Sequence, residues 1–547
     1  MITARMDRRL PALLFATLLG IGGSLAFASC CDYGKGASSV ETAARPTLRI
    51  YALGAAAGAI EPCGCVEDML GGVDHLAALL TDEKKVAPAS LLLSAGPMFF
   101  SDPTVPEEQR AQAIMKAETM AEALGIMGLT AFAPGVNDFA LGPQEFERFT
   151  RLAKSAPLAA NHAGRQGIKA HSIVEAGGLK VGLVGGADLS EAKALGAESN
   201  ELLASLKSAV EAAQKEGAQL VVALLALPRG PALRLIEQLD AVDVAIVGKN
   251  IEAGENNDPP FPPELVGRTL VVQAPNHVQG ASVIDLFVPE PGSGLQDGSG
   301  LEKEAELARA RERLESLSER LKSAEAPGSG VDAEDIASLR REVSSLSDKV
   351  KELEARPVAT PSGNHFKYAY VEIREKLGAS KVVEQKLSDY YQRVNEHNKV
   401  AFADRRPAPV EPGQASYVGV QACVDCHQEE YDFWKTTRHS HAYRTLVDVH
   451  KEYNLDCVSC HVTGYERPGG STVTHVEKLD AVQCEVCHGP GSLHLASPSD
   501  PKLIDMPRTD LCADSCHHPP HVKPDWKVSD AWPKILGPGH GLPNSAP

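Results

Sequence analysis

Four copies of one short pattern of cysteine and histidine lie close together near the end of the chain. Two thiols separated by two residues can bond to both vinyl groups of a heme, and a histidine directly after the second thiol can then ligate the iron. Three copies have this spacing, whereas the fourth has one extra residue between its cysteines. The pattern predicts covalently bound heme c, four groups in all. The residues are Cys423, Cys426 and His427; Cys457, Cys460 and His461; Cys484, Cys487 and His488; and Cys512, Cys516 and His517.

Two other uses of clustered cysteines have to be compared with heme attachment. An exported chain can use such cysteines as a disulfide framework, and Cys-x-x-Cys pairs can bind zinc. Neither use requires a histidine directly after each second cysteine. Histidine accounts for only 18 of the 547 residues, so four such coincidences would be very rare. The spacing therefore favours heme, with the fourth copy as the least regular case.

Each iron also needs either a second axial ligand or an open coordination position. Met506 is the one residue of this region that could supply a thioether sulfur, whereas eight histidines are available outside the four motifs. We therefore expect bis-histidine ligation, which keeps reduction potentials low relative to histidine–methionine cytochromes. The eight are His439, His441, His450, His475, His494, His518, His521 and His540.

The local sequence around these motifs resembles that of the cytochrome c-554 family of tetraheme carriers, over about residues 416–520. The run Arg438–Tyr443 after Trp434 is similar to the histidine-bearing helix of that family, and Cys484–His494 is similar to its third-heme segment. The resemblance implies that His439 and His494 are distal ligands. It leaves His441 as the alternative to His439. The run His518-Pro519-Pro520-His521 departs from the family, so the distal ligand of the fourth heme stays open, with His521 as a candidate.

Four hemes within residues 416–547 must lie close together, because so short and polar a segment cannot build a large core between them. A string of this kind conducts electrons. It becomes an enzyme only if one iron keeps an open position that faces a pocket.

Short apolar runs alternate with amphipathic runs in the first half of the chain, which predicts an α/β domain with a largely buried sheet. The expected strands are Leu48–Leu53, Ser90–Ser94, Val181–Val184, Leu220–Leu225, Val242–Val247 and Thr269–Val272. The expected helices include Glu107–Leu124, Leu202–Gln214 and Pro231–Leu239.

The landmarks of this domain resemble the UshA-like, 5′-nucleotidase-type metallophosphoesterases over about residues 47–290, which implies a four-layer αββα sandwich. The glycines of the family's motifs are present, but most residues at the ligand places differ. Ala55 and Ala57 stand where the family has its first Asp-x-His. The other landmarks are Gly96-Pro97, Gly135–Phe139, Leu225-Ala226 and Gly248-Lys249-Asn250-Ile251. Because alanine, proline, valine and isoleucine cannot coordinate a metal, we expect a pseudo-phosphoesterase without its two-metal site.

Cys63 and Cys65 lie close to the lost site, within Glu61-Pro62-Cys63-Gly64-Cys65. Thiols two residues apart can form a strained disulfide that is more easily reduced than a structural one. They can also bind a soft metal together with His75. A static disulfide or an inert pair is the third alternative. The sequence leaves these alternatives open, and the pair is a redox candidate.

Residues 1–29 have the form of a signal peptide, with a positive start and an apolar run from Leu10 to Phe27. Two cleavage sites compete: an Ala-x-Ala site, and a lipobox that would leave Cys30 as a lipidated N-terminus. No later stretch approaches the roughly 18 apolar residues of a membrane span. We expect an exported protein in the periplasm, or a lipoprotein of the outer membrane or cell surface, joined to its first domain by a linker over residues 30–46.

Three segments connect the α/β domain to the heme region. A linker over residues 291–300 is rich in Gly and Ser. Residues 301–356 hold two leucine-rich runs around a Pro-Gly break, which favours an antiparallel coiled-coil hairpin over a charged linker of partial helicity. Residues 357–415 are expected to be a helical connector, and residues 416–547 the cytochrome domain.

The net charge of −18 argues against nucleic acid or an anionic membrane surface as a partner. It suits redox partner proteins that are basic, or quinol-linked donors. The favoured hypothesis is an electron-transfer protein with a non-catalytic domain for docking or redox sensing. The alternative is a multiheme oxidoreductase that acts on a small sulfur or nitrogen compound at an open iron. A working phosphoesterase is disfavoured because its ligands are missing.

Overall fold

The computed structural model describes residues 45–540, except 63–67, 84–86, 88, 193–199, 253–254, 256, 292, 328, 360, 519–521 and 523–525. The predicted signal segment, Cys30, the Cys63/Cys65 pair and His521 lie outside the described residues. Within the described part of the chain, no helix is both long and apolar enough to cross a membrane.

The first sheet is built around β1, whose six residues are all buried. Its seven strands run in the order β12-β13-β11-β1-β2-β3-β4. Strands β1 to β4 are parallel neighbours, and β11 joins β1 in the antiparallel sense. The strands are β1 (Leu48–Leu53), β2 (Ser90–Ala95), β3 (Leu129–Ala133), β4 (Ala156–Pro157), β11 (Gly280–Phe287), β12 (Gln296–Asp297) and β13 (His365–Glu372).

The second sheet has six strands in the order β5-β6-β7-β8-β10-β9. Its centre, from β6 to β10, is parallel, and both edges are antiparallel. All seven residues of β7 are buried, as expected for a strand that is covered on both faces. The strands are β5 (His171–Ala176), β6 (Leu179–Ala187), β7 (Leu220–Ala226), β8 (Val244–Gly248), β9 (Glu264–Val266) and β10 (Thr269–Val272).

The two sheets pack face to face and helices cover their outer faces. One apolar cluster joins the two sheets to α1 (Val73–Glu83), α2 (Arg110–Met127) and α3 (Pro143–Ala153). A second cluster lies between the other face of the second sheet and α4 (Leu202–Lys215) and α5 (Arg229–Ile236). The predicted four-layer αββα arrangement is confirmed.

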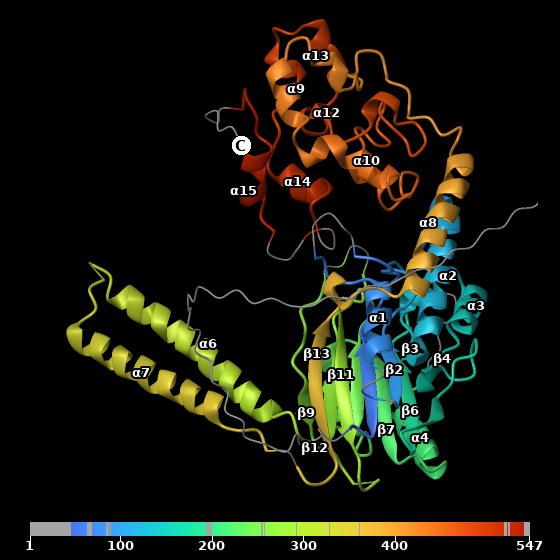
Figure 1. Ribbon diagram of the computed structural model, residues 1–547, viewed down its shortest axis with the longest axis vertical. Coiled ribbons are helices and arrows are strands. Elements are labelled where there is room, and N and C mark those ends of the chain that lie inside the picture. The colour runs from blue at the N-terminus through green and yellow to red at the C-terminus, as the bar shows by residue number, and fades with distance from the viewer. Residues whose placement is uncertain are drawn as a thin grey trace, which may run out of the picture. The chain divides into compact units, whose positions relative to one another are not determined.

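The expectation that residues 357–415 form a purely helical connector is wrong. Strand β13 lies in this segment and pairs with β11 over eight residues, from Gly280 opposite Glu372 to Phe287 opposite His365. Strand β13 is the neighbour of β11 in the sheet, although the hairpin separates the two strands in the sequence. The first sheet is therefore complete only after the chain has passed through the helical hairpin (Figure 1). Helix α8 (Lys381–Ala401) then continues to the heme region.

Helices α6 (Leu301–Ala324) and α7 (Ala333–Ala355) form an antiparallel hairpin (Figure 1). Leu307 and Ala310 of α6 pack against Val350 and Leu353 of α7. Ion pairs flank this seam, including Arg311 with Glu354 at 2.7 Å. The hairpin is therefore an insertion between β12 and β13. Supercoiling of the two helices stays a prediction.

The C-terminal part consists of short helices and loops, as predicted. Its apolar core is small: Phe402, Val458, Val462 and Val473 form the buried cluster. The helices are α9 (Gln428–Trp434), α10 (Ala442–Val447), α11 (Val458–His461), α12 (Cys484–His488), α13 (Ser492–Ala496), α14 (Asp510–Ser515) and α15 (Val528–Ala531).

A buried network of side-chain amides fastens the segment before Cys457 to α2 and α8. The side-chain oxygen of Gln112 accepts from Asn398 (2.9 Å) and from the backbone N–H of Leu455 (3.0 Å), and its NH₂ donates to Asn454 (3.1 Å). Asn398 also donates to the carbonyl of Tyr453 (2.8 Å). Gln112, Asn398 and Asn454 are each at most 4% exposed. Water cannot replace a partner that is lost in such a place, so the contact depends on all three amides.

Replacing Gln112 with Ala should lower the free energy of unfolding by about 1–3 kcal/mol, because the partners that it leaves are buried and unsatisfied. Denaturant unfolding of the full chain measures this change. Gln392→Ala on the exposed side of α8 is the matched control, with an expected effect within about 0.5 kcal/mol. Equal effects of the two substitutions would show that the network contributes no stability.

Candidate heme-binding site

Each Cys-x-x-Cys-His motif lies in one tight turn of backbone. In the first motif the N–H of His427 donates to the carbonyl of Cys423 at 2.9 Å. The second and third motifs lie on α11 and α12, which end at His461 and His488. Residues three and four apart share a face of such a turn. The two thiols and the imidazole therefore face the same side, as thioether bonds and iron ligation require.

The fourth motif absorbs its extra residue by widening the turn. The N–H of Cys516 donates to the carbonyl of Cys512 at 3.2 Å, and the N–H of His517 reaches the same carbonyl at 2.7 Å. The second bond spans five residues, as in a π-bulge, whereas the bond in the first motif spans four. His517 thus keeps the relation to Cys512 that the shorter motifs give to their histidines. The irregular spacing fits heme attachment.

None of the eight cysteines of the four motifs forms a disulfide. Neighbouring thiols from different motifs lie close together. A hydrogen bond between Cys423 and Cys484 raises the pKa of Cys423 and lowers that of Cys484. A hydrogen bond from Cys516 lowers the pKa of Cys460 to about 6. The first motif is therefore adjacent to the third, and the second to the fourth.

The third and fourth motifs are also close to each other. Burial raises the pKa of Cys487 to about 11, and the nearby thiol of Cys512 adds to the rise. The four attachment points therefore follow one another in space in the order first, third, fourth, second.

Two of the proximal histidines have their tautomer fixed by the backbone. The Nδ1 of His461 lies 2.6 Å from the carbonyl oxygen of Ala442, and the Nδ1 of His488 lies 2.9 Å from that of Asp505. A carbonyl can only accept, so Nδ1 carries the proton and Nε2 is left for a metal. Burial lowers the pKa of both imidazoles, which favours this neutral form.

Two pairs of imidazole rings have the separation that two ligands of one iron would have. An imidazole nitrogen lies about 2 Å from the metal that it ligates and its ring centre roughly 1 Å farther, so opposed rings have centres about 6 Å apart. The ring centres of His439 and His517 are 6.2 Å apart, and those of His488 and His540 are 6.1 Å apart. These donor sets fit heme.

The implied distal ligands have different environments. His439 lies opposite the histidine of the fourth motif and not that of the first. His494, on α13, has a buried Nδ1 without a hydrogen-bond partner, so this predicted ligand stays a candidate. His441 is exposed in the same short turn as His439. His540 is one of the eight histidines available as distal ligands, but its pairing with His488 arises only on folding, which brings the C-terminal segment next to the third motif.

Three apolar side chains lie together at the edge of the α/β domain where the sequence predicts that metal ligands are missing. Ala55, Ala57 and Ile251 form a cluster in which each is 3% exposed. Among the described residues, no group of three or more His, Cys, Asp or Glu side chains could hold a metal ion.

Polar side chains brace the loops around this edge. The buried carboxylate of Asp138 accepts from the N–H groups of Met98 (2.7 Å), Phe99 (2.9 Å) and Gly135 (3.1 Å). Asn137 donates to the carbonyls of Ser101 and Ile251. These bonds join three loops that belong to different strands of the two sheets.

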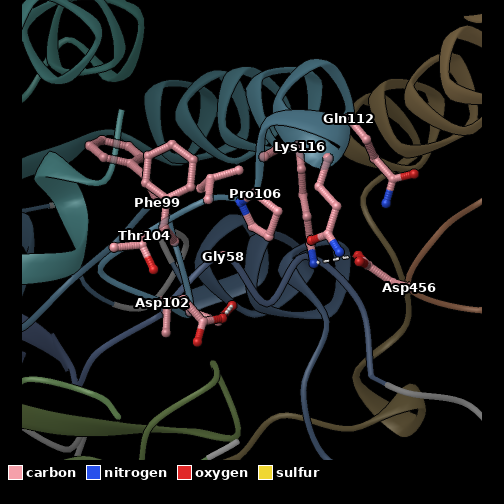
Figure 2. A pocket seen from close by; sticks show the side chains of 14 residues that line it. Gly58, Phe99, Asp102, Thr104, Pro106, Gln112, Lys116 and Asp456 are labelled. Carbon is pink, nitrogen blue, oxygen red and sulfur yellow. Dashed lines mark hydrogen bonds and ion pairs between the residues drawn. The ribbon is translucent and has the colours of Figure 1, made fainter. Parts of the chain in front are cut away.

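A cavity of about 340 Å³ opens beside this cluster. Its wall includes Ala57, Phe99 and Gln112, and it reaches Asp456, the residue before Cys457. Figure 2 shows Lys116 and Asp456 pointing toward each other, with 2.9 Å between ammonium and carboxylate. The cavity therefore lies between the braced loops and the second heme motif.

The carboxylate of Glu61 ties the start of the Cys63/Cys65 segment to the heme-bearing part. It accepts a hydrogen bond from Tyr391 at 2.7 Å and forms an ion pair with Lys451. The Nδ1 of His75 forms a hydrogen bond with the carbonyl oxygen of Gly378, 2.6 Å away. The redox, metal-binding and inert alternatives for the two thiols stay predictions.

Asp138 should make folding depend on pH. Burial raises the pKa of its carboxyl from 3.8 to about 7, so the folded chain binds this proton more tightly than the unfolded chain does. Its stabilising contribution is complete below the unfolded pKa and is lost as the pH rises through the folded pKa. The difference in Tm between the wild type and Asp138→Asn should therefore shrink between about pH 4 and about pH 7 and stay constant at higher pH. A difference that is already constant from about pH 4 to about pH 7 would contradict the assignment.

Comparison with known proteins agrees with the motifs. Residues 422–489 match the family described as cytochrome c554 and c-prime. Cytochrome c-554 of Nitrosomonas europaea is 36% identical over 93 residues, which is 14% of this chain. The chain spans only 40% of the length of that relative. The resemblance of the C-terminal part to the cytochrome c554 family is thus confirmed, and it implies covalently bound heme c.

Solved structures similar to the chain include two nucleotidases. The 5′-nucleotidase precursor of Thermus thermophilus has 16% identity and a TM-score of 0.44, and the match covers 69% of this chain and 62% of that chain. The NAD nucleotidase of Haemophilus influenzae has 12% identity and a TM-score of 0.40, with coverages of 68% and 63%.

Proposed function

We propose that this chain, whose residues 422–489 match the cytochrome c554 and c-prime family, is an exported cytochrome that carries electrons through four covalently bound hemes. The observation that carries the proposal is the tight backbone turn of the motifs, because residues three and four apart share a face of such a turn. The wider turn of the fourth motif supports the count of four. When bound, each heme supplies one reversible one-electron iron couple.

The proximity of the thiols supports an electron path in the order first, third, fourth, second. The two ends of this path differ. Cys426 and His427 of the first motif are exposed, which suits exchange with a redox partner protein. The second motif directly follows the segment that is fastened to α2 and α8. Electrons would enter or leave at the first motif, and the second motif would communicate with the α/β domain.

The α/β domain serves as a docking or redox-sensing unit and not as a phosphoesterase. Ala55, Ala57 and Ile251 offer no donor atoms where a two-metal site would need them. Lys249, which belongs to the landmark Gly248-Lys249-Asn250-Ile251, forms ion pairs with Glu255 and Asp258. We place the protein in the periplasm or, through a lipid on Cys30, at a membrane surface.

A second candidate function follows from the cavity beside Asp456. The cavity of about 340 Å³, whose wall includes Asp456 directly before the second motif, is large enough for a small oxidised sulfur or nitrogen compound that would react at an open iron. The protein would then be a multiheme oxidoreductase, with the other hemes as its electron supply.

Heme counting and electron paramagnetic resonance together test these functions. The pyridine haemochrome assay should give four hemes per chain, and three after Cys512→Ser with Cys516→Ser. A count of three in the wild type would contradict heme at the fourth motif. A high-spin ferric signal that shifts when nitrite or sulfite is added would favour the oxidoreductase over the carrier.

Removal of divalent metals tests the α/β domain. Because its loops are held by hydrogen bonds, chelation should leave the Tm of the full chain unchanged. Elemental analysis should find no stoichiometric transition metal other than heme iron. Two such metals per chain would overturn the pseudo-phosphoesterase assignment.

A further inference from the structure

We infer that Glu485, within the third motif, positions the first heme beside the third and lowers the reduction potential of both through its buried negative charge. The inference rests on the proposed function, since it requires hemes at these two motifs. Glu485 follows directly after Cys484. The corresponding residues of the other motifs are Val424, Val458 and Ala513, so the pattern for heme attachment does not itself call for a carboxylate at this place.

The carboxylate of Glu485 is buried and accepts hydrogen bonds from three backbone N–H groups. The N–H of Val418 lies 3.0 and 3.1 Å from its two oxygens, and the N–H groups of Gly419 and Gly491 each donate at 2.7 Å. The residue is only 3% exposed. Each of these contacts is an N–H donor, so the group acts purely as an acceptor, as an ionised carboxylate does.

These bonds fasten the segment that leads into the first motif to the third motif. Further bonds lie on either side of Glu485. The side-chain oxygen of Gln483 accepts from the N–H of Val420 at 2.7 Å. Ser492 donates its N–H to the carbonyl of Ser416 at 3.2 Å, and its hydroxyl accepts from the N–H of Ser416 at 2.8 Å. The first motif therefore begins from a fixed point on the third motif, and Glu485 is the charged contact in the middle of this row.

The charge of Glu485 acts on the attachment points of both motifs. A hydrogen bond with Cys484, together with burial, raises the pKa of Cys423, and the charge of Glu485 adds to this rise. The same charge opposes the lowering of the pKa of Cys484 that the hydrogen bond with Cys423 produces. The carboxylate thus lies within electrostatic range of a cysteine from each of the two motifs.

A buried negative charge in this place favours oxidised heme. Ferric heme carries one more positive charge than ferrous heme, so a nearby carboxylate stabilises the ferric form and lowers the reduction potential. Water and salt would screen the same charge at the surface. The burial of Glu485 between the two motifs is therefore what makes its charge effective.

The charge is tested by replacing Glu485 with Gln in the full-length protein. Two of the four reduction potentials should rise, while the pyridine haemochrome count stays at four. At the wild-type midpoint the ratio of ferrous to ferric heme should increase about threefold to tenfold, or about 30–60 mV for a one-electron couple. Spectroelectrochemical titration measures this shift. Glu429→Gln is the matched control, because it removes the same charge from an exposed residue near His427 and should shift the potentials much less.

Two further variants separate the charge from the position. Glu485→Asp keeps the charge on a shorter side chain, so the potentials should stay close to those of the wild type. Glu485→Ala removes all the bonds of the carboxylate and frees the segment before the first motif. Circular dichroism of the Soret band, which reports the coupling of neighbouring hemes, should then weaken at an unchanged heme count. An unchanged Soret signal in Glu485→Ala would overturn the positioning role.

A background without the fourth heme assigns the shifts. In Cys512→Ser with Cys516→Ser, Glu485→Gln should still raise two of the three remaining potentials. The inference would be overturned by potentials that do not move in Glu485→Gln, that move equally in Glu429→Gln or Glu485→Asp, or that no longer move in this background. Absence of heme from the first or third motif in the wild type would instead refute the proposed function.

Discussion

The turn that closes each heme motif is the constraint on which the C-terminal part depends. In the first motif the N–H of His427 donates to the carbonyl of Cys423, and in the fourth motif the N–H of His517 donates to that of Cys512 across one residue more. The protein supplies little else there, since the buried cluster around Phe402 and Val458 is small. Porphyrin surface must complete the apolar interior of this part, because its own side chains bury too little.

In the α/β domain, hydrogen bonds made by two buried side chains hold the loops at the edge of the two sheets together. Asp138 joins the loop after β2 to the loop after β3, and Asn137 reaches across to the second sheet. These side-chain to backbone bonds hold the loops in place beside the apolar cluster of Ala55, Ala57 and Ile251.

Local features were predictable from the sequence and long-range pairings were not. The apolar runs gave strands β1, β7 and β10 at nearly their observed bounds, because buried strands need continuous apolar residues. Strand β13 was missed, since its partner β11 is separated from it by the whole hairpin. The spatial order of the motifs and the pairing of His540 with His488 likewise depend on tertiary contacts that no local spacing encodes.

The amide network around Gln112 has a consequence for maturation of the protein. Heme attachment requires an extended, accessible chain, whereas the network buries the residues immediately before Cys457. The residues that must be accessible for attachment at the second motif are therefore directly next to ones that the folded protein holds against α2 and α8.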